Sequence, residues 1–437
     1  MNMLMNDKIR KIWVYNGGID HNWQDNRYGV RKINDIYEQK MFNHQAEFLL
    51  FLASKNDIVY LVQNPDDEFL EDIKSLGFEK AQIQIIPEKD ITISQILDNN
   101  KELLYKHLEK GQEYLYVPYI LSKYDENLCN HESIKLYGSS FETVKKVNNK
   151  IEVRKILSEM GVPVIDGYVC SCKEEMQKSY NKLKEMGYSK FAIKEPYNSA
   201  GKGVYCIRND RQFQSFVRML RFPDNDDNFQ VAVEGWIDNK RDINYQIEIS
   251  TEGKVELVTI TEQHILVTSY RGTVCPPQLT VKQKVLYEEY AQEIGKKLFS
   301  LGYTGLVGID SIIKEDDSII PAIEFNARLN QSTFYAPIVE KFKHMKKKTF
   351  IRSYDVQTKS ELNYSKVKNL LKSEGIYLDK NKYEGVYLLN SSCLSLYQDN
   401  SGMYHSRVFL ATTYDKDKED TEQCKLIDKF IKVLQKA

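Results

Sequence analysis

The hydrophobic pattern of the N-terminal third changes period repeatedly, which predicts short strands separated by helices. Apolar runs at 12–15, 57–62, 81–86 and 114–117 are typical of buried strands, whereas 45–53, 68–76 and 91–109 have helical spacing, the last with a break near Asn99. Strands that alternate with helices favour a small open, parallel α/β layer, which we assign to residues 1–140. Gly17 and Gly18 follow the first strand, but without the G-x-G-x-x-G fingerprint of a dinucleotide site.

The hydrophobic pattern and the polar segments between apolar runs divide the rest of the chain into a central part, residues 141–350, and a C-terminal part, residues 356–437. A polar linker over 131–147 precedes a helical pattern that Asn148-Asn149-Lys150 opens and Gly161 ends. After a helix at 334–343, we interpret the basic run 343–348 as a solvated face. The C-terminal part is predicted to contain a helix at 365–374, strands at 385–390 and 406–411, and an amphipathic helix at 422–436.

The most informative polar side chains lie on two apolar runs joined by a polar turn at 314–318. Glu324 and Asn326 are two residues apart, so on a strand they project from one face, and antiparallel pairing would put Asp310 beside them. Two carboxylates and an amide oxygen suit Mg²⁺, which often completes its ligand shell with nucleotide phosphates. Arg328 would share this face and could bind an anionic intermediate. An ordinary amphipathic hairpin with a polar outer face would give the same local pattern.

A second group of residues predicts a phosphate-binding flap. Lys194 closes an apolar strand, and the following turn, which contains Ser199, Gly201 and Gly203, leads into another apolar strand. Glycine lets backbone N–H groups approach a phosphate closely. The turn is not a Walker A loop, because no glycine lies five residues before Gly201 and Lys202 is followed by glycine instead of serine or threonine.

Downstream residues are candidates for binding the base and sugar of a nucleotide. Glu234 ends an apolar strand and is followed by a short linker with Trp236 and Ile237. A glutamate at such a position can accept a hydrogen bond from an exocyclic amine, while the adjacent backbone can pair with an adenine edge. Asp242 follows at a distance along the sequence that would let it accept hydrogen bonds from ribose hydroxyls.

Composition narrows the range of partners. A chain of 437 residues with 42% apolar residues can build a substantial core, and its net charge of −1 gives no reason to expect nucleic acid or an anionic membrane surface. The longest apolar stretches, such as 47–53, are too short to span a bilayer, and the N-terminus lacks the apolar core of a signal peptide. Seven scattered cysteines suggest reduced thiols. We therefore expect a cytoplasmic protein.

Taken in order, these residues resemble the ATP-grasp superfamily of carboxylate ligases. The resemblance covers roughly residues 145–335, and the stretch from Glu324 to Arg328 is most similar to the Glu-x-Asn-x-Arg form of the carbamoyl-phosphate and biotin-carboxylase types. It implies an α/β and α+β multidomain fold, with an ATP-grasp core between an N-terminal pre-ATP-grasp domain and a small C-terminal α+β unit. Residues 160–240 would form its nucleotide-binding subdomain.

The resemblance also implies roles for the candidate residues. Lys150, Lys194 and the flap residues Ser199, Gly201 and Gly203 would contact the nucleotide phosphates, Glu234, Trp236 and Ile237 the adenine, and Asp242 the ribose. Asp310, Glu324 and Asn326 would hold two Mg²⁺ ions, for which Mn²⁺ could substitute. D-alanine–D-alanine ligases carry an arginine two residues before the metal aspartate, where this chain has Gly308. Arg328 and Arg271 are therefore, with Lys194, the catalytic candidates.

The polar segment 261–277 is expected to be a mobile loop that closes over ATP and acceptor, and its His264 is either a general base or a structural histidine. In layout the chain resembles the branch of pheganomycin-type peptide ligases and the butirosin-pathway ligase, which loads an acyl carrier protein. The resemblance thus implies specialised metabolism and small-molecule or peptide substrates; it leaves the oligomeric state open, a dimer being one option.

Three functions follow from these observations. The leading one is an ATP-dependent ligase that activates a carboxylate as an acyl phosphate and joins it to an amine. The alternative is an amino acid–acyl carrier protein ligase, which forms a thioester. A nucleotide-binding regulatory protein without catalysis is the third, and the intact set of Asp310, Glu324 and Asn326 argues against it.

Overall fold

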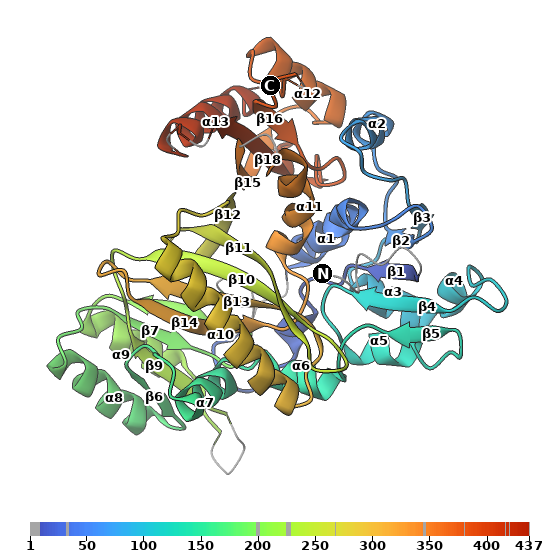
Figure 1. The fold of residues 1–437 in the computed structure, drawn as a ribbon. Helices are drawn as coiled ribbons and strands as arrows, with labels where there is room; N and C mark the ends of the chain where they lie inside the picture. The colour runs from blue at the N-terminus through green and yellow to red at the C-terminus, as the bar shows by residue number, and fades with distance from the viewer. Residues whose placement is uncertain are drawn as a thin grey trace.

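The computed structural model describes residues 9–31, 35–197, 202–223, 229–266, 268–343, 347–379, 381–415, 417–418 and 420–436. Three β-sheets organise the chain, and Figure 1 shows the parallel sheet, the small antiparallel sheet and the large antiparallel sheet around a common centre. Among the described residues, no helix combines the length and apolar character needed to cross a membrane.

The N-terminal sheet is parallel, as the alternating pattern predicts. Its strand order is β3-β2-β1-β4-β5, with β1 (Arg10–Val14), β2 (Ile58–Leu61), β3 (Gln82–Ile85), β4 (Tyr114–Pro118) and β5 (Ile134–Leu136). The helical segments that accompany it are η1 (Ile19–Asn22), α1 (Ile36–His44), η2 (Gln45–Phe51), α2 (Asp67–Ser75), α3 (Ile93–Asn99), α4 (Glu102–Tyr105) and α5 (Lys123–Leu128). The linker predicted over 131–147 is wrong, since it contains β5 and α6 (Phe141–Val147).

The small sheet follows a helix whose ends match the sequence signals. Helix α7 (Lys150–Met160) begins after Asn149, whose side chain accepts from the backbone N–H groups of Ile151 and Glu152, and it ends at Gly161, where φ is 70°. The sheet order is β6-β9-β7-β8, from β6 (Gly167–Cys170), β7 (Phe191–Lys194), β8 (Val204–Ile207) and β9 (Val231–Gly235). Helices α8 (Lys173–Glu185) and α9 (Asp210–Met219) accompany it.

The large sheet joins the central and C-terminal parts of the chain. Its order is β14-β13-β10-β11-β12-β15-β18-β16, and β17 also pairs with β18. The strands are β10 (Arg241–Ile249), β11 (Val255–Leu266), β12 (Ser269–Cys275), β13 (Gly305–Ile313), β14 (Ile319–Asn326), β15 (Lys347–Thr358), β16 (Gly385–Leu388), β17 (Tyr397–Gln398) and β18 (Tyr404–Asp415). Its helices are α10 (Val281–Ser300), α11 (Gln331–Lys343), α12 (Tyr364–Ser373) and α13 (Asp420–Leu434).

The C-terminal strands therefore continue the central sheet instead of forming a sheet of their own. The connection is the pairing of β12 with β15, where Gly272 lies opposite Arg352. A Cβ atom at Gly272 would lie 2.3 Å from the carbonyl oxygen of Ile351, so glycine permits this close approach.

The basic run 343–348 was interpreted as a solvated face, but Lys347 and Lys348 start β15 and form ion pairs with Asp415 and Asp420.

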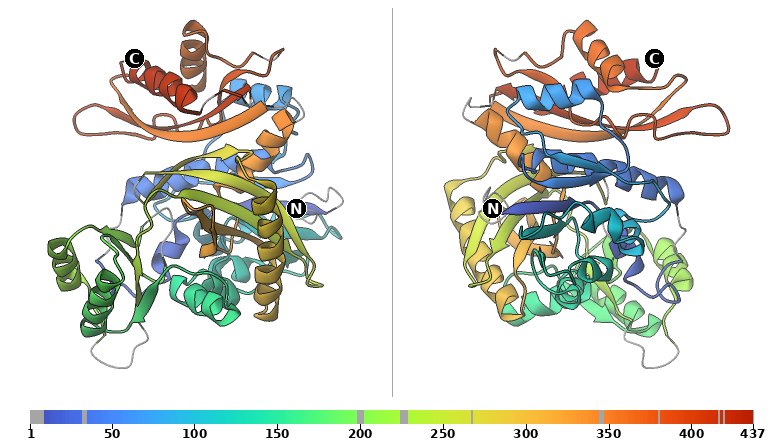
Figure 2. Two further views of the ribbon diagram at one scale, coloured as in Figure 1. Left: turned by 60° about the vertical axis from the view of Figure 1, so that its left-hand side comes forward. Right: turned by 90° about the vertical axis from the view of Figure 1, so that its right-hand side faces the viewer.

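The N-terminal part of the chain packs against the C-terminal part. Glu47 is buried and accepts hydrogen bonds from the backbone N–H groups of Ser391 and Ser392 and from the Ser391 hydroxyl. Figure 2 shows α2 of the N-terminal sheet against the C-terminal elements, where Tyr364 of α12 donates a 3.0 Å hydrogen bond to Asp72. These contacts close the molecule around the centre at which the candidate site lies.

Candidate active site

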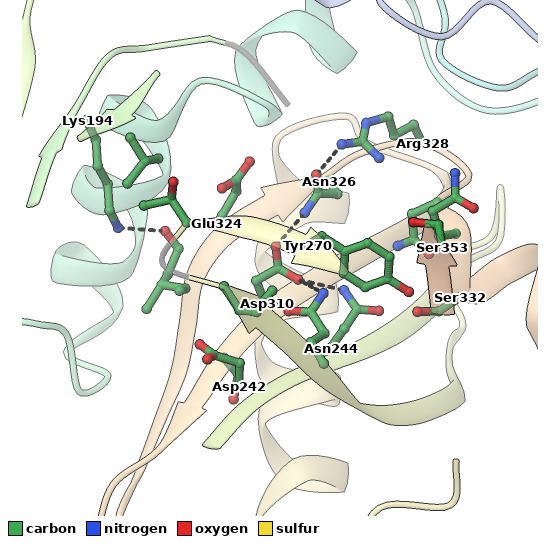
Figure 3. A pocket seen from close by; sticks show the side chains of 18 of the residues that line it. Lys194, Asp242, Asn244, Tyr270, Asp310, Glu324, Asn326, Arg328, Ser332 and Ser353 are labelled. Atoms are coloured by element: carbon green, nitrogen blue, oxygen red, sulfur yellow. Dashed lines mark hydrogen bonds between the residues drawn. The ribbon is translucent and has the colours of Figure 1, made fainter. Parts of the chain in front are cut away.

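A cavity of about 300 Å³ lies where the three sheets meet. Its walls come from the segments that follow β1 and β4, from α1, from the small sheet, and from strands β10 to β15 and β18. Figure 3 shows Lys194 at one side, the Asp310 cluster in the middle, and Tyr270, Ser332 and Ser353 at the other side. Side chains from distant parts of the sequence thus converge on one space.

Antiparallel pairing brings Asp310 beside Glu324 and Asn326, as the sequence predicts. Asp310 of β13 lies directly opposite Glu324 of β14, and Asn326 is opposite Gly308. Asn326 donates a 3.0 Å hydrogen bond to one Asp310 carboxylate oxygen, and Asn244 donates a 2.8 Å bond to the other. Burial and the neighbouring charge of Glu324 raise the pKa of Asp310 to about 6, although these hydrogen bonds lower it.

This cluster fits a magnesium ion bound together with a nucleotide. Two adjacent carboxylates are a favourable environment for a cation, and carboxylate and amide oxygens are ligands that Mg²⁺ accepts. Among the described residues, no three histidines, cysteines, aspartates or glutamates gather at one metal site. Water and phosphate oxygens would therefore have to complete the ligand shell, as is usual for Mg²⁺ in nucleotide-dependent enzymes.

Two buried lysines flank the acidic cluster. Lys150, at the start of α7, lies 3.1 Å from Glu324, and Lys194, at the end of β7, lies 2.8 Å from Glu234. Arg154 holds the other Glu234 oxygen at 2.8 Å. Burial would raise the pKa of Glu234, but the charges of Lys194 and Arg154 outweigh it, so the pKa is lowered. The Glu234 carboxylate, predicted to face an adenine amine, is thus engaged by two cations.

The side of the cavity next to Lys194 suits a flat base and its sugar. Its apolar lining comprises Ile165, Ala192, Val204, Trp236, Ile237, Ile312 and Ile323. Asp242 also lines the cavity, where Lys240 binds it through a short ion pair. Trp236, Ile237 and Asp242 therefore line one cavity. Gly203 immediately precedes Val204 and has a φ of 71°, while Ser199 and Gly201 lie outside the described residues.

Arg328 lies on the other side of the acidic cluster (Figure 3). It donates a 2.5 Å hydrogen bond to the side-chain oxygen of Asn326, and its guanidinium group lies 5.6 Å from the centre of the Tyr119 ring. Tyr119 in turn stacks on Tyr15 at 4.4 Å. The aromatic contacts hold a permanent positive charge beside the acidic cluster.

Arg271 and His264 do not lie in this cavity. The segment 261–277 was expected to be a loop, but it forms the hairpin of β11 and β12, in which successive side chains point to opposite faces. Gln263, Ile265 and Tyr270 line the cavity. Arg271 instead lies 3.3 Å from Asp355, and the His264 ring lies 6.0 Å from that of Phe350. The hairpin therefore presents Tyr270 to the cavity in place of the predicted Arg271.

The packing around position 308 explains why a glycine lies there. A Cβ atom there would lie 1.9 Å from the side-chain nitrogen of Asn330, which also lines the cavity. Gln246 donates a 2.7 Å hydrogen bond to the Asn330 side-chain oxygen. Asn330 thus occupies the space that an arginine at position 308 would need.

Several lining residues could not be recognised in the sequence. Tyr15, Gln45 and Tyr119 belong to the N-terminal part, whereas Ser353, Arg407 and Phe409 come from β15 and β18. None of them belongs to a short motif, and only the three-dimensional packing brings them together.

Comparison with known proteins identifies the family. A protein of Niallia circulans named [butirosin acyl-carrier protein]–L-glutamate ligase is 30% identical to this chain over 330 residues, which cover 75% of this chain and 74% of that protein. The ATP-grasp domain family matches residues 155–339. The chain belongs to the ATP-grasp family. It is therefore an ATP-dependent ligase, and Mg²⁺ is the metal that ATP-grasp ligases generally use with ATP.

More distant relatives agree with this family assignment. The arginine-specific large chain of carbamoyl phosphate synthase from Bacillus subtilis (strain 168) is 21% identical over 286 residues, covering 62% of this chain and 26% of that protein. N5-carboxyaminoimidazole synthetase from Staphylococcus aureus, solved with ADP, has a TM-score of 0.55 at 13% identity and covers 98% of this chain and 99% of that chain. Biotin carboxylase from Campylobacter jejuni has a TM-score of 0.55 at 16% identity, covering 95% of this chain and 89% of that chain. The two structures support the ATP-grasp fold, and the predicted fold class is confirmed.

Proposed function

We propose that this ATP-grasp ligase activates a substrate carboxylate as an acyl phosphate and joins the acyl group to an amine, forming an amide or peptide bond. The observation that carries the proposal is the convergence of Asp310, Glu324 and Asn326 with the buried Lys194 on one side and Arg328 on the other, in a cavity whose lining is partly apolar. A site that holds cations and metal-binding oxygens away from bulk water favours phosphoryl transfer through positioning and electrostatics.

The chemistry has two balanced steps. A carboxylate oxygen of the acid attacks the γ-phosphorus of ATP, and the bond to the β–γ bridging oxygen breaks to release ADP. The amine nitrogen then attacks the acyl carbon, phosphate leaves with the oxygen that it received, and the nitrogen loses a proton. Neither step requires a nucleophilic side chain.

The described residues have separate roles in this scheme. Lys150 and Lys194 neutralise phosphate charge, and Glu234 positions Lys194 through its 2.8 Å ion pair. Asp310, Glu324 and Asn326 would hold two Mg²⁺ ions, or Mn²⁺ in their place, which neutralise charge on the transferring phosphoryl group. Arg328 supplies a fork of donors for the oxygens of the acid and of its acyl phosphate.

A carrier-protein thiol is the second candidate acceptor. The specific observation in its favour is the name of the Niallia circulans relative, which specifies an acyl carrier protein and L-glutamate. The first step would be unchanged, and a phosphopantetheine sulfur would replace the amine nitrogen in the second. The acid substrate, the acceptor and a dimeric state are all expectations that solution experiments can test.

The proposal is tested by supplying Mg-ATP, hydroxylamine as a small acceptor, and a panel of amino acids and short peptides as acids. We expect at least one acid to cause release of ADP and phosphate with formation of its hydroxamate. Release of ADP without any dependence on an acid, or release of AMP and pyrophosphate, would overturn the proposal.

A further inference from the structure

A second cavity, of about 390 Å³, adjoins the first and has no part in the scheme above. It lies between α1 of the N-terminal part and strands β15, β17 and β18 of the C-terminal part. Both cavities are lined by Glu38, Met41 and Arg407, so these side chains mark the junction between the two spaces. Both volumes fall in the range of small-molecule sites, about 300–1,000 Å³.

Arg407 is poorly satisfied at this junction. One terminal nitrogen lies 3.0 Å from the sulfur of Met41, a weak acceptor, and the other donates a 3.5 Å hydrogen bond to the Ser353 hydroxyl. Its Nε is buried and has no hydrogen-bond partner among the described residues, since the Asp355 oxygen that faces it lies 3.6 Å away. A guanidinium group has five N–H donors, so most of its capacity to bind an anion remains available.

Arg407 also shares its acidic partner with a second arginine. The one carboxylate that lies within ion-pair distance of it in the described structure is Asp355, at 3.6 Å. Asp355 is exposed and lies closer, 3.3 Å, to Arg271. Two guanidinium groups thus share one carboxylate, while Glu38, the other acidic residue at the junction, is paired with Lys202. Asp35, which also lines the second cavity, accepts hydrogen bonds from the backbone N–H groups of Tyr37 and Glu38 at the start of α1. Arg407 therefore shares with Arg271 the one acidic partner that it has among the described residues.

An aromatic wall extends from the junction into the second cavity. Tyr37 of α1 stacks on Tyr397 of β17 at 3.9 Å, and Tyr397 stacks on His405 of β18 at 4.4 Å. All three rings line the second cavity. The Tyr37 side chain is 45% exposed, which places this wall at the entrance from solvent. The wall offers a surface for an extended, partly apolar molecule.

We propose that the second cavity is the acceptor site, and that Arg407 binds an anionic group of the acceptor, a carboxylate or a phosphate. The inference rests on the proposed function. A nucleotide would occupy the side of the first cavity that contains Lys194 and Asp242. The junction would then stay open, and through it an acceptor in the second cavity could reach the acyl phosphate at Arg328. An acceptor anchored at Arg407 would direct its nucleophile toward the acyl phosphate and leave its remaining length along the aromatic wall.

Two sources of the anionic group can be distinguished with paired probes. An amino acid or peptide acceptor presents a carboxylate, so a panel of dipeptides is compared with the same dipeptides as C-terminal amides. A carrier-protein arm presents a phosphate, so phosphopantetheine is compared with pantetheine. The measured quantity is the preference for the anionic member of each pair, as the ratio of kcat/KM values.

The variant is Arg407→Gln, and the matched control is Arg352→Gln. Arg352 is also a strand arginine in this sheet, with an ion pair of 3.2 Å to Asp428 of α13, but it lines neither cavity. Turnover with hydroxylamine, which needs no anchoring group, is measured for both. Arg407→Gln should lower the anionic preference about tenfold or more, and much more than it lowers hydroxylamine turnover. Arg352→Gln should change neither quantity.

The outcomes separate this inference from the function on which it rests. A wild type without acid-dependent hydroxylamine turnover would contradict the ligase chemistry alone, because calorimetric binding of the paired probes still tests Arg407 directly. Loss of the preference in the dipeptide pair assigns the site to a carboxylate, and loss in the pantetheine pair assigns it to a phosphate. If Arg407→Gln keeps the wild-type preference in turnover and in binding for both pairs, the inference is wrong.

Discussion

Replacing Glu234 by glutamine measures how much the buried ion pair between Lys194 and Glu234 contributes to the free energy of unfolding. The Lys194–Glu234 pair spans 2.8 Å and its side chains are 10% and 6% exposed, whereas the Lys190–Asp238 pair spans 2.9 Å with 39% and 50% exposed. Both pairs join a lysine in or just before β7 to an acid in or just after β9. They therefore differ mainly in their contact with water, which makes Asp238→Asn a matched control for Glu234→Gln.

The expected effects follow from that difference. Removing one partner of a buried pair leaves an uncompensated charge and costs about 3–5 kcal/mol, while an exposed pair contributes about 0–1 kcal/mol. Glutamine keeps the size of Glu234 and one acceptor oxygen, so we expect the lower end, about 3 kcal/mol, and less than about 1 kcal/mol for Asp238→Asn. Arg154 also loses its carboxylate partner in the first variant.

Urea unfolding followed by circular dichroism gives both free-energy differences. The lowered pKa of Glu234 also predicts the direction in which the stability difference between wild type and Glu234→Gln changes with pH. Because the folded pKa lies below its ordinary value of 4.5, the stabilisation by Glu234 is fully present above that pH and is lost as pH falls through the folded pKa. The gap between wild type and Glu234→Gln should therefore narrow in acid. Equal, small losses for both variants at pH 7 would refute the reasoning.

Two further substitutions test the site itself. Glu324→Ala should abolish acid-dependent ADP release while circular dichroism shows an unchanged fold, because the variant lacks one of two carboxylates that would hold the metal; normal turnover would contradict the metal assignment. Arg328→Lys keeps the charge but loses the planar fork over Tyr119, so turnover of the acid should fall about tenfold or more, roughly 1.4 kcal/mol, with ATP affinity nearly unchanged. Wild-type kinetics in this variant would exclude Arg328 from the oxyanion role.

The parts of the site that could be predicted from the sequence are those set by local geometry. Strand periodicity and one turn suffice to bring Asp310 near Glu324 on the same face, although a register shift between Asp310 and Ile312 sets the final pairing. The cap residue Asn149 suffices to start the helix that carries Lys150. These features depend on residues close in sequence, for which side-chain direction follows from backbone conformation.

The prediction of Arg271 shows where sequence reasoning was insufficient. Treating 261–277 as a loop removed the constraint that adjacent side chains on a strand face opposite ways. Recognising β12 as a strand would have put either Tyr270 or Arg271 in the cavity, but not both. The wall formed by Tyr15, Ser353 and Arg407 is a different case, because long-range packing of separate elements creates it and no local signal reports it.

The most direct test of the account uses an acid, identified with the hydroxylamine assay, that carries ¹⁸O in its carboxylate. Attack of this carboxylate on the γ-phosphate and later cleavage at the acyl carbon would transfer one labelled oxygen to the phosphate. We therefore predict ADP together with phosphate that contains ¹⁸O. Label in AMP, or phosphate without label, would contradict the acyl-phosphate mechanism and with it the central claim.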